Sequence, residues 1–319
     1  MTSFEIFKII LLNIFSYMAL GFLAAWLGIF SQPRIQFVMR KVVINFLFPC
    51  LVADKILKNL EITDFTNAII LFIGALVMFI GNWLIVRLWI PRVAQDRITE
   101  NTMLHCNTFH NYGFMVFPLV IAFLGDKALA LTLIYTLTGD GLLWSFGIYL
   151  LQRDPNSKVK WKEIITPPAI AVVVSVFLAF TGLSQFIPRE IFFLSYYPAL
   201  IAVPVALVGA GGIFYHAFSG IKLERLPIKE LAYSLLSRMI LLPLFWSVVI
   251  YFCIPVYPAR QILFFEAIMP ASVVMVALVA IYHGNKQYAV VFSLATILFS
   301  IVTIPFYLGL IMSLGGGKL

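Results

Sequence analysis

Ten long apolar runs, separated by short connections, dominate this chain of 319 residues. A helix needs about 20 mostly apolar residues to cross roughly 30 Å of hydrocarbon. Inside a bilayer only helices and closed barrels satisfy every backbone hydrogen-bonding group. We therefore predict an all-α polytopic membrane protein with ten transmembrane helices. The expected spans are 5–30, 38–57, 66–90, 101–124, 127–151, 164–183, 191–217, 228–253, 260–283 and 287–312.

Composition agrees with a chain surrounded by a lipid bilayer. Hydrophobic residues make up 62% of the chain and charged residues only 11%, which is too little polar surface to cover a soluble globule. The start of the chain has neither a basic segment nor a small-residue cleavage site, so we expect an uncleaved first span. Cys50, Cys106 and Cys253 all fall inside predicted spans, which argues against a disulfide framework and against a zinc site.

The net charge of +8 is distributed over loops, and it therefore predicts orientation rather than a nucleic-acid partner. The odd-numbered loops carry fourteen Lys and Arg residues, whereas the even-numbered loops carry five. Because positive charge favours the cytoplasmic side, we expect the odd loops in the cytoplasm and both termini on the external side.

Two of the predicted spans are interrupted at matching places. The fourth contains Asn111-Tyr112-Gly113 and ends at the turn Gly125-Asp126-Lys127, and the ninth contains Pro270-Ala271-Ser272 and ends at Gly284-Asn285-Lys286. Each interruption begins fourteen residues before its turn. Interrupted apolar segments at corresponding positions of two halves point to the binding site of a transporter. The alternative is that proline and glycine are simply common in transmembrane helices.

The two interrupted segments are predicted to cross the membrane in opposite senses, because they are five spans apart. The most polar and most basic loop, from Gln152 to Glu163, separates two sets of five spans. We therefore predict a 5+5 inverted repeat, with residues 1–155 as the first five-helix repeat, residues 156–319 as the second, and broken helices 4 and 9 that cross. Such repeats are a recurrent architecture of secondary transporters.

A helix break near the middle of the membrane favours an anionic substrate. The half-helix that follows each break begins with unpaired N–H groups that carry a partial positive charge, and two such ends together suit a carboxylate. Asn111 and Ser272 are expected to donate hydrogen bonds, and Gly113 to allow a close approach. The predicted substrate-binding residues at the crossing are Asn111, Tyr112, Gly113, Pro270, Ala271 and Ser272.

Ionisable residues deep in the spans require a partner or a function, because each costs about 2.5–3.5 kcal/mol on insertion scales. Glu266 and Asp140, with Asn107 at the position that matches Glu266, are the predicted coupling residues for H⁺ or, near Glu266, for Na⁺. The alternative for Glu266 is a place near the surface, six residues after Arg260. Arg238 either neutralises Asp140 or Glu266 or attracts the substrate anion, and it is a further substrate-binding candidate.

The sequence carries no motif of an enzyme active site, such as HExxH, GxSxG or a phosphate-binding glycine loop. We therefore expect no enzymatic activity, no cofactor and no metal. His105 and His110 lie five residues apart, off one helical face, and a hydrogen-bonded core role is favoured over a metal site. An integral-membrane enzyme, a passive channel and a transporter-like ligand sensor remain alternatives.

The run Asn111-Tyr112-Gly113-Phe114-Met115-Val116-Phe117-Pro118-Leu119 resembles the Asn-x-x-x-Met-Gly-x-Pro-Leu signature in the fourth span of the auxin efflux carrier family. This family includes plant auxin exporters and bacterial malate permease-like transporters, and it is similar to the wider bile acid and sodium symporter superfamily. The ten-span layout and the proline of the ninth span also resemble the family. His110 stands where plant members carry proline, and Val116 where the family often has glycine.

The resemblance implies a homodimer in which transport helices 3–5 and 8–10 move against scaffold helices 1, 2, 6 and 7. It implies a small carboxylate substrate, such as malate or an auxin-like acid, held near Asn111. The short central loop favours a bacterial member in the inner membrane, with periplasmic termini. The sequence therefore predicts a secondary active transporter of small organic anions that works by alternating access or elevator motion.

Overall fold

The computed structural model describes residues 10–29, 33–113, 115–152, 165–218 and 227–314, together with Glu5 and Lys8. The structure is all-helical, with 86% helix and no strand among the residues that it describes. Phe114 of the interrupted motif, the basic loop 153–163 and the tail 315–319 lie outside the described residues.

The helices of the predicted first repeat follow one another closely along the chain. They are η1 (Ile10–Phe15), α2 (Ser16–Trp26), α3 (Pro33–Val42), η2 (Val43–Leu47), α4 (Phe48–Asn59), η3 (Ile62–Asp64), α5 (Phe65–Arg87), α6 (Ile90–Val93), α7 (Arg97–Thr108), α8 (Val116–Leu142), η4 (Leu143–Gly147) and α9 (Ile148–Gln152).

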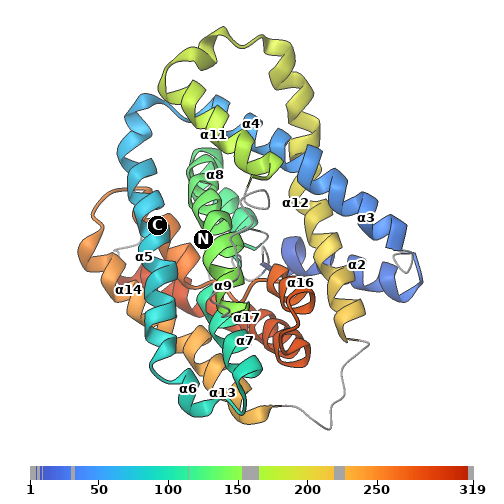
Figure 1. The fold of residues 1–319 in the computed structure, drawn as a ribbon. Coiled ribbons are helices and arrows are strands. Elements are labelled where there is room, and N and C mark those ends of the chain that lie inside the picture. The colour runs from blue at the N-terminus through green and yellow to red at the C-terminus, as the bar shows by residue number, and fades with distance from the viewer. Residues whose placement is uncertain are drawn as a thin grey trace.

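The helices of the predicted second repeat are similar in length. They are α11 (Pro167–Phe180), η5 (Leu183–Phe186), α12 (Arg189–Phe218), α13 (Ile228–Leu236), η7 (Ser237–Leu241), α14 (Leu242–Cys253), α15 (Ala259–Ala267), α16 (Val274–Ile281) and α17 (Lys286–Leu314). In Figure 1, α2, α3 and α12 lie together on one side, α5, α13 and α14 lie on the other, and α8 lies between them.

Several helical segments have the length and composition of membrane spans. Those long and apolar enough to cross a membrane are Ile62–Val93, Val116–Gln152, Glu190–His216, Ile228–Cys253 and Lys286–Ile311. Leu12–Trp26 and Pro167–Phe180 are shorter apolar helices. The protein is therefore a multi-pass membrane protein, while the total of ten spans and the inverted repeat stay predictions.

The chain reverses direction at Gly125, inside the residues assigned to α8. Gly125 has φ +82°, a left-handed conformation that side chains with a Cβ rarely adopt. The Thr136 hydroxyl donates a hydrogen bond to the Tyr112 carbonyl at 3.0 Å. Twenty-four residues of straight helix would separate these groups by about 36 Å. The predicted turn at Gly125 is therefore present, and it brings the second part of α8 back along the first interruption.

π-helical turns interrupt three of the long helices, at η2, η4 and η7. Pro49 and Pro243 closely follow two of them, and each lacks the N–H that would bond the carbonyl four residues earlier. For Pro243 that carbonyl belongs to Met239, and it accepts a hydrogen bond from the Tyr307 hydroxyl at 2.8 Å instead. Such turns are frequent at functional sites, and all three contribute residues to the site described below.

The helices α2 and α12 approach each other at two glycines. A Cβ on Gly21 would lie 1.9 Å from the Val208 carbonyl oxygen, and a Cβ on Gly211 would lie 1.9 Å from the Met18 carbonyl oxygen. Small residues permit this backbone approach between helices in lipid. The two glycines therefore join the helices of the first and seventh predicted spans, both of which are predicted scaffold helices.

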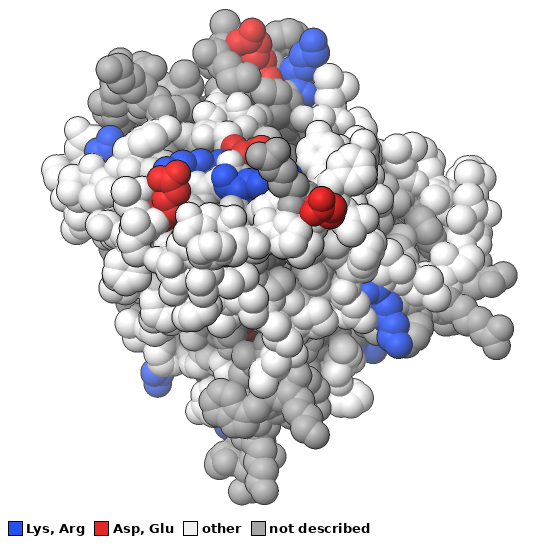
Figure 2. All heavy atoms as spheres, turned by 90° about the horizontal axis from the view of Figure 1, so that it is seen from above, with Lys and Arg blue, Asp and Glu red and all other residues white. Residues whose placement is uncertain are grey.

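Ion pairs connect the turn at Gly125 to the end of α4 and to η3. Lys55 Nζ lies 3.0 Å from Asp126 Oδ2, and Lys127 Nζ lies 2.9 Å from Asp64 Oδ1. Figure 2 shows the molecule from above, with acidic and basic side chains close together within a mostly uncharged surface. In the predicted orientation this end of α4 lies on the external side.

Candidate functional site

The two interrupted segments cross in the structure and bind each other through their backbones. The Asn111 N–H donates to the Pro270 carbonyl at 2.8 Å, and His110 and Ala271 form an isolated antiparallel bridge. The Ala271 N–H donates to the Thr296 hydroxyl of α17 at 3.2 Å. The unwound segments are therefore satisfied by each other and by a neighbouring helix, as non-helical backbone at membrane depth requires.

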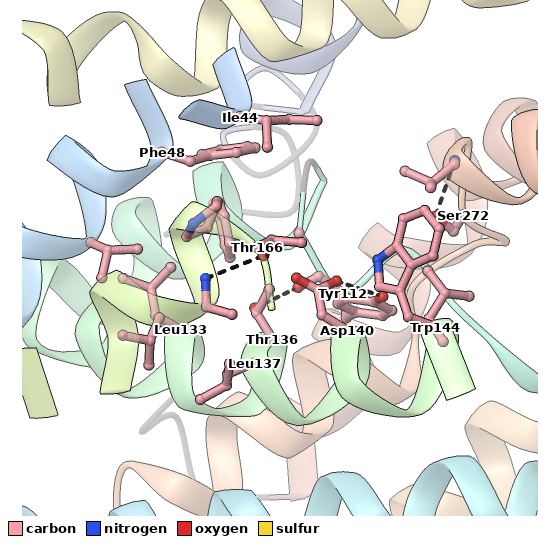
Figure 3. A pocket seen from close by; sticks show the side chains of 18 of the residues that line it. Ile44, Phe48, Tyr112, Leu133, Thr136, Leu137, Asp140, Trp144, Thr166 and Ser272 are labelled. Atoms are coloured by element: carbon pink, nitrogen blue, oxygen red, sulfur yellow. Dashed lines mark hydrogen bonds between the residues drawn. The ribbon is translucent and has the colours of Figure 1, made fainter. Parts of the chain in front are cut away.

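A cavity of about 180 Å³ lies beside this crossing. Figure 3 shows Ile44 and Phe48 on one side of it and Tyr112, Asp140 and Trp144 on the other. Its walls combine helices of the predicted scaffold, α4 and α11, with helices of the predicted transport part, α8 and α16. The lining residues are Ile44, Phe48, Val52, Asn111, Tyr112, Gly113, Phe117, Leu133, Thr136, Leu137, Asp140, Leu143, Trp144, Thr166, Pro168, Ala169, Val172, Ser272 and Val274.

The structure divides the predicted substrate-binding residues into two groups. Asn111, Tyr112, Gly113 and Ser272 line the cavity, whereas Pro270 and Ala271 form the backbone contact behind it and do not line it. The Ser272 hydroxyl accepts a hydrogen bond from the N–H of Val274, the first residue of α16, at 3.3 Å.

Asn111 offers an unused hydrogen-bond donor at the cavity. The residue is 1% exposed, and its side-chain amide nitrogen has no partner among the described residues. A buried donor without a partner is costly, and a bound acceptor would remove that cost. The amide of Asn111 is therefore suited to bind an oxygen of a ligand.

Asp140 lines the cavity beside Tyr112. The Tyr112 hydroxyl donates to Asp140 Oδ1 at 2.9 Å, and the Tyr112 carbonyl accepts from Thr136 (Figure 3). An ion pair between Asp140 and Arg238, one of the alternatives for Arg238, is not present among the described residues. The second part of α8 presents Asp140 to Tyr112, whereas Arg238 of η7 donates to the Met269 carbonyl of the other crossing segment.

Glu266 lies behind the crossing, in a chain of hydrogen-bonding groups. Its Oε2 is 3.2 Å from His110 Nε2, which is 3.1 Å from the Tyr135 hydroxyl. Glu266 is completely buried, so the alternative placement near the surface beside Arg260 was wrong. The ring of His110 stacks on Phe79, with centroids 4.8 Å apart.

Arg238, in the π turn η7, donates from Nε and Nη2 to the Met269 carbonyl at 3.1 and 2.9 Å. It is 1% exposed, and it interacts electrostatically with Glu266 and Tyr135. The carbonyl belongs to the second interruption, where the helix break leaves it without a helical partner. Arg238 therefore caps the break and supplies a positive charge near Glu266, but it does not line the cavity.

Asn107 lies in a different polar cluster from Glu266, although the two residues occupy matching positions in the sequence. Its amide nitrogen donates to the Met103 carbonyl at 2.9 Å and to the hydroxyls of Ser234 and Tyr288 at 3.2 Å. The matching positions therefore do not place the two side chains in one site.

Several site residues were missed by the sequence analysis. His110 was expected to have a core role, yet it joins Glu266 to Tyr135. Thr136 lies four residues before Asp140, and residues at this spacing share a helix face, so the spacing could have identified it. Trp144 lines the cavity from η4, and no local signal in the sequence marks that π turn.

The described residues contain no group of three or more His, Cys, Asp and Glu side chains that could hold a metal ion. His105 Nδ1 lies 2.9 Å from the Gly147 carbonyl, and His105 is completely buried. The structure thus places the two histidines of the first interruption in separate environments.

The comparisons with known proteins bear on the first half of the chain. The model of a family described as membrane transport protein matches residues 7–160, which cover the predicted first repeat and the first crossing segment. A comparison with curated proteins finds no match.

Proposed function

We propose a substrate class and a mechanism for this chain, which belongs to the auxin efflux carrier family of membrane transport proteins. The protein is a secondary transporter of small organic anions, carboxylates such as malate or auxin-like acids, and it works in a bacterial inner membrane by alternating access. Membership of this family supports a role in membrane transport. The substrate class and the mechanism rest on the geometry of the crossing.

The observation that carries the proposal is the cavity beside the two crossed, interrupted segments. Asn111 offers a free amide donor there, and the half-helices α8 and α16 both begin next to it. Helix N-termini favour anions because their first N–H groups lack helical partners. The apolar walls formed by Phe48, Trp144 and Val172 suit the carbon skeleton of a small acid.

The cavity also supports an elevator-like movement. Its walls come from α4 and α11 on one side and from α8 and α16 on the other, which are the predicted scaffold and transport parts. A displacement between the two parts would open the cavity, while the crossing itself moves as a unit because its backbone is bonded internally. Alternating access around a site between two such parts is a common transporter mechanism.

Proton coupling is favoured over sodium coupling at Glu266. Its carboxylate contacts an imidazole that in turn contacts the Tyr135 hydroxyl, and both neighbours exchange protons. Arg238 already supplies a cation near Glu266 and donates to the Met269 carbonyl. A second cation there would be repelled. Asp140, hydrogen-bonded to Tyr112 at the cavity, is the second proton-exchanging group of the proposal.

The substrate-binding part of the proposal is tested with purified protein in detergent. Mono- and dicarboxylates are screened by thermal shift, and the affinity of the best acid is measured for the wild type, for Asn111→Ala and for Asn59→Ala. Asn59 bonds the Lys55 carbonyl within α4 and does not line the cavity. Loss of a hydrogen bond to a charged group costs about 1.5–3 kcal/mol. Asn111→Ala should therefore bind the acid about 10- to 100-fold more weakly.

The control variant, Asn59→Ala, should bind the acid with the same affinity as the wild type. Equal affinity in Asn111→Ala and the wild type would contradict the assignment of the site. Equal weakening in both variants would mean that the effect is one of general stability, and it would contradict the assignment as well.

A further inference from the structure

Glu230 is a buried carboxylate that the proposed transport mechanism does not use. It lies in the first turn of α13, it is 0% exposed, and neither carboxylate oxygen has a hydrogen-bond partner among the described residues. It does not line the cavity. The nearby helix N-terminus offsets part of the cost of burying this charge, but an unpaired buried carboxylate still costs several kcal/mol. A bound cation would remove this cost, as protonation of the carboxylate would.

One helical turn along α13 from Glu230, side chains of three different helices are hydrogen-bonded to one another, namely Ser234, Tyr288 and Asn107. The Ser234 hydroxyl, one turn after Glu230 on the same face of α13, accepts from the Tyr288 hydroxyl at 2.7 Å and from the Asn107 amide nitrogen at 3.2 Å. Tyr288 interacts electrostatically with Glu230. The side-chain oxygen of Asn107 is fully buried and has no partner among the described residues.

We propose that Glu230, Asn107, Ser234 and Tyr288 bind a monovalent cation, Na⁺ or K⁺, between α13, α7 and α17. Carboxylate, amide and hydroxyl oxygens are the ligands that hard cations prefer. One carboxylate balances one positive charge, so a monovalent ion leaves the buried site neutral. This site is separate from Glu266, where Arg238 already supplies the positive charge.

The cation has a structural consequence for the transport site. It joins α13 and α17 to α7, and Asn107 lies four residues, about one helical turn, before Asn111. The ion therefore stabilises the helix that leads into the first interruption. In the predicted orientation α13 begins on the cytoplasmic side, so the proposed ion site lies toward the cytoplasm.

The test measures thermal unfolding of the purified full-length protein in detergent, with NaCl or KCl exchanged against choline chloride at constant ionic strength. A ligand that binds only the folded state raises Tm by mass action. At a concentration a hundredfold above Kd we expect a saturable rise of about 5 °C. Na⁺ and K⁺ in separate titrations show which ion the site prefers.

Three variants locate the ion. Glu230→Gln keeps the shape of the side chain and should lose the cation-dependent rise, and Tyr288→Phe should need a several-fold higher cation concentration. Glu190→Gln, an exposed carboxylate at the start of α12, should respond as the wild type does. Asn111→Ala should keep the full cation response, so failure of this proposal and failure of the proposed transport site are distinguishable.

The proposal is overturned if choline chloride gives the same Tm as NaCl and KCl in the wild type, because the effect is then one of ionic strength alone. It is also overturned if Glu230→Gln keeps the rise, because the ion then binds elsewhere. If Glu230→Gln does not fold, Tyr288→Phe decides: an unchanged cation dependence in that variant contradicts the site.

Discussion

In the proposed mechanism, different side chains at the crossing bind the ligand and exchange the proton. Asn111 has a free donor at the cavity, whereas Glu266 lies behind the crossing in contact with His110. His110 is adjacent to Asn111 in the chain, and its backbone pairs with Ala271 of the other segment. In the proposed mechanism, a change of protonation at the Glu266 and His110 pair would therefore act directly on the segment that is proposed to bind substrate.

Replacing Glu266 by Gln should separate substrate binding from coupling. The variant keeps the size of the side chain but removes the group that exchanges a proton with His110. We expect substrate affinity within about threefold of the wild type and loss of the response of uptake to an imposed pH gradient. Uptake into proteoliposomes with and without the gradient is the measurement, and Glu190→Gln is the control. A Glu266→Gln protein whose uptake still follows the gradient would refute the coupling role.

Tyr112 holds Asp140 at the cavity through one hydrogen bond. Tyr112→Phe removes the hydroxyl and leaves the ring, so the carboxylate of Asp140 loses a partner inside a largely apolar cavity. Loss of a hydrogen bond to a charged group costs about 1.5–3 kcal/mol. We expect a clearly lower Tm for Tyr112→Phe than for the wild type, measured by thermal unfolding of the purified protein. An unchanged Tm would show that this hydrogen bond does not hold Asp140 at the cavity.

At the scale of the helices, the position of α7 depends on its cap. The Asp96 carboxylate accepts hydrogen bonds from the Thr99 N–H at 2.8 Å and from the Thr99 hydroxyl at 2.9 Å. Capping side chains of this kind stabilise a helix by about 0.5–2 kcal/mol. Because α7 leads into the first interruption, its start also fixes the depth of Asn111.

Because the cap is a carboxylate, the stability of α7 should depend on pH. The Thr99 N–H bond lowers the pKa of Asp96 below its ordinary value. A lowered pKa means that the stabilisation is present above the ordinary value, about 3.9, and is lost as the pH falls through the folded-state value. Asp96→Ala should lower Tm at pH 7, whereas Asp96→Asn should keep the cap and remove its part of the acid sensitivity. Thermal unfolding at pH 7 and at about pH 2 tests both, because the stabilisation is lost only below the ordinary pKa of the carboxyl group. Identical acid sensitivity of Asp96→Asn and the wild type would contradict a capping role for Asp96.

The packing of α2 against α12 gives a second prediction at this scale. Gly211→Ala places a methyl group 1.9 Å from a backbone oxygen of α2, which the helices relieve only by separating, at a cost of about 1–3 kcal/mol. Gly209→Ala is the matched control, because its nearest neighbour, 3.2 Å away, is the flexible methyl end of Met39. We expect a clearly lower Tm for Gly211→Ala than for Gly209→Ala. Equal values would show that the close approach does not support stability.

The sequence predicted the helix breaks but not the contacts made by several of the polar side chains. The interruptions are caused by residues that act locally on the backbone, namely Asn111, Pro270 and the glycines of the turns. They can therefore be predicted from adjacent residues. The partners of Arg238 and Asn107 are 31 and 127 residues away, at Met269 and Ser234. They depend on which faces of three helices meet, and that is decided by packing of the whole molecule rather than by local pattern.

For the whole molecule, alternating access requires that the cavity opens to each side of the membrane in turn. The ion pairs of Lys55 with Asp126 and of Lys127 with Asp64 connect α4 and η3 to the Gly125 turn at the predicted external end. The Lys55–Asp126 pair connects a predicted scaffold helix to the predicted transport part. Surface ion pairs contribute about 0–1 kcal/mol each, which biases a conformational equilibrium without locking it.

Counterflow of a labelled carboxylate in proteoliposomes tests the central claim most directly. Vesicles are loaded with unlabelled acid, and the label is added outside. A transporter with its site at the crossing should accumulate the labelled acid transiently and chemically unchanged, and Asn111→Ala should accumulate about tenfold less or nothing. The account would be contradicted by an acid that binds but never enters, by a chemically altered product, or by full counterflow in Asn111→Ala.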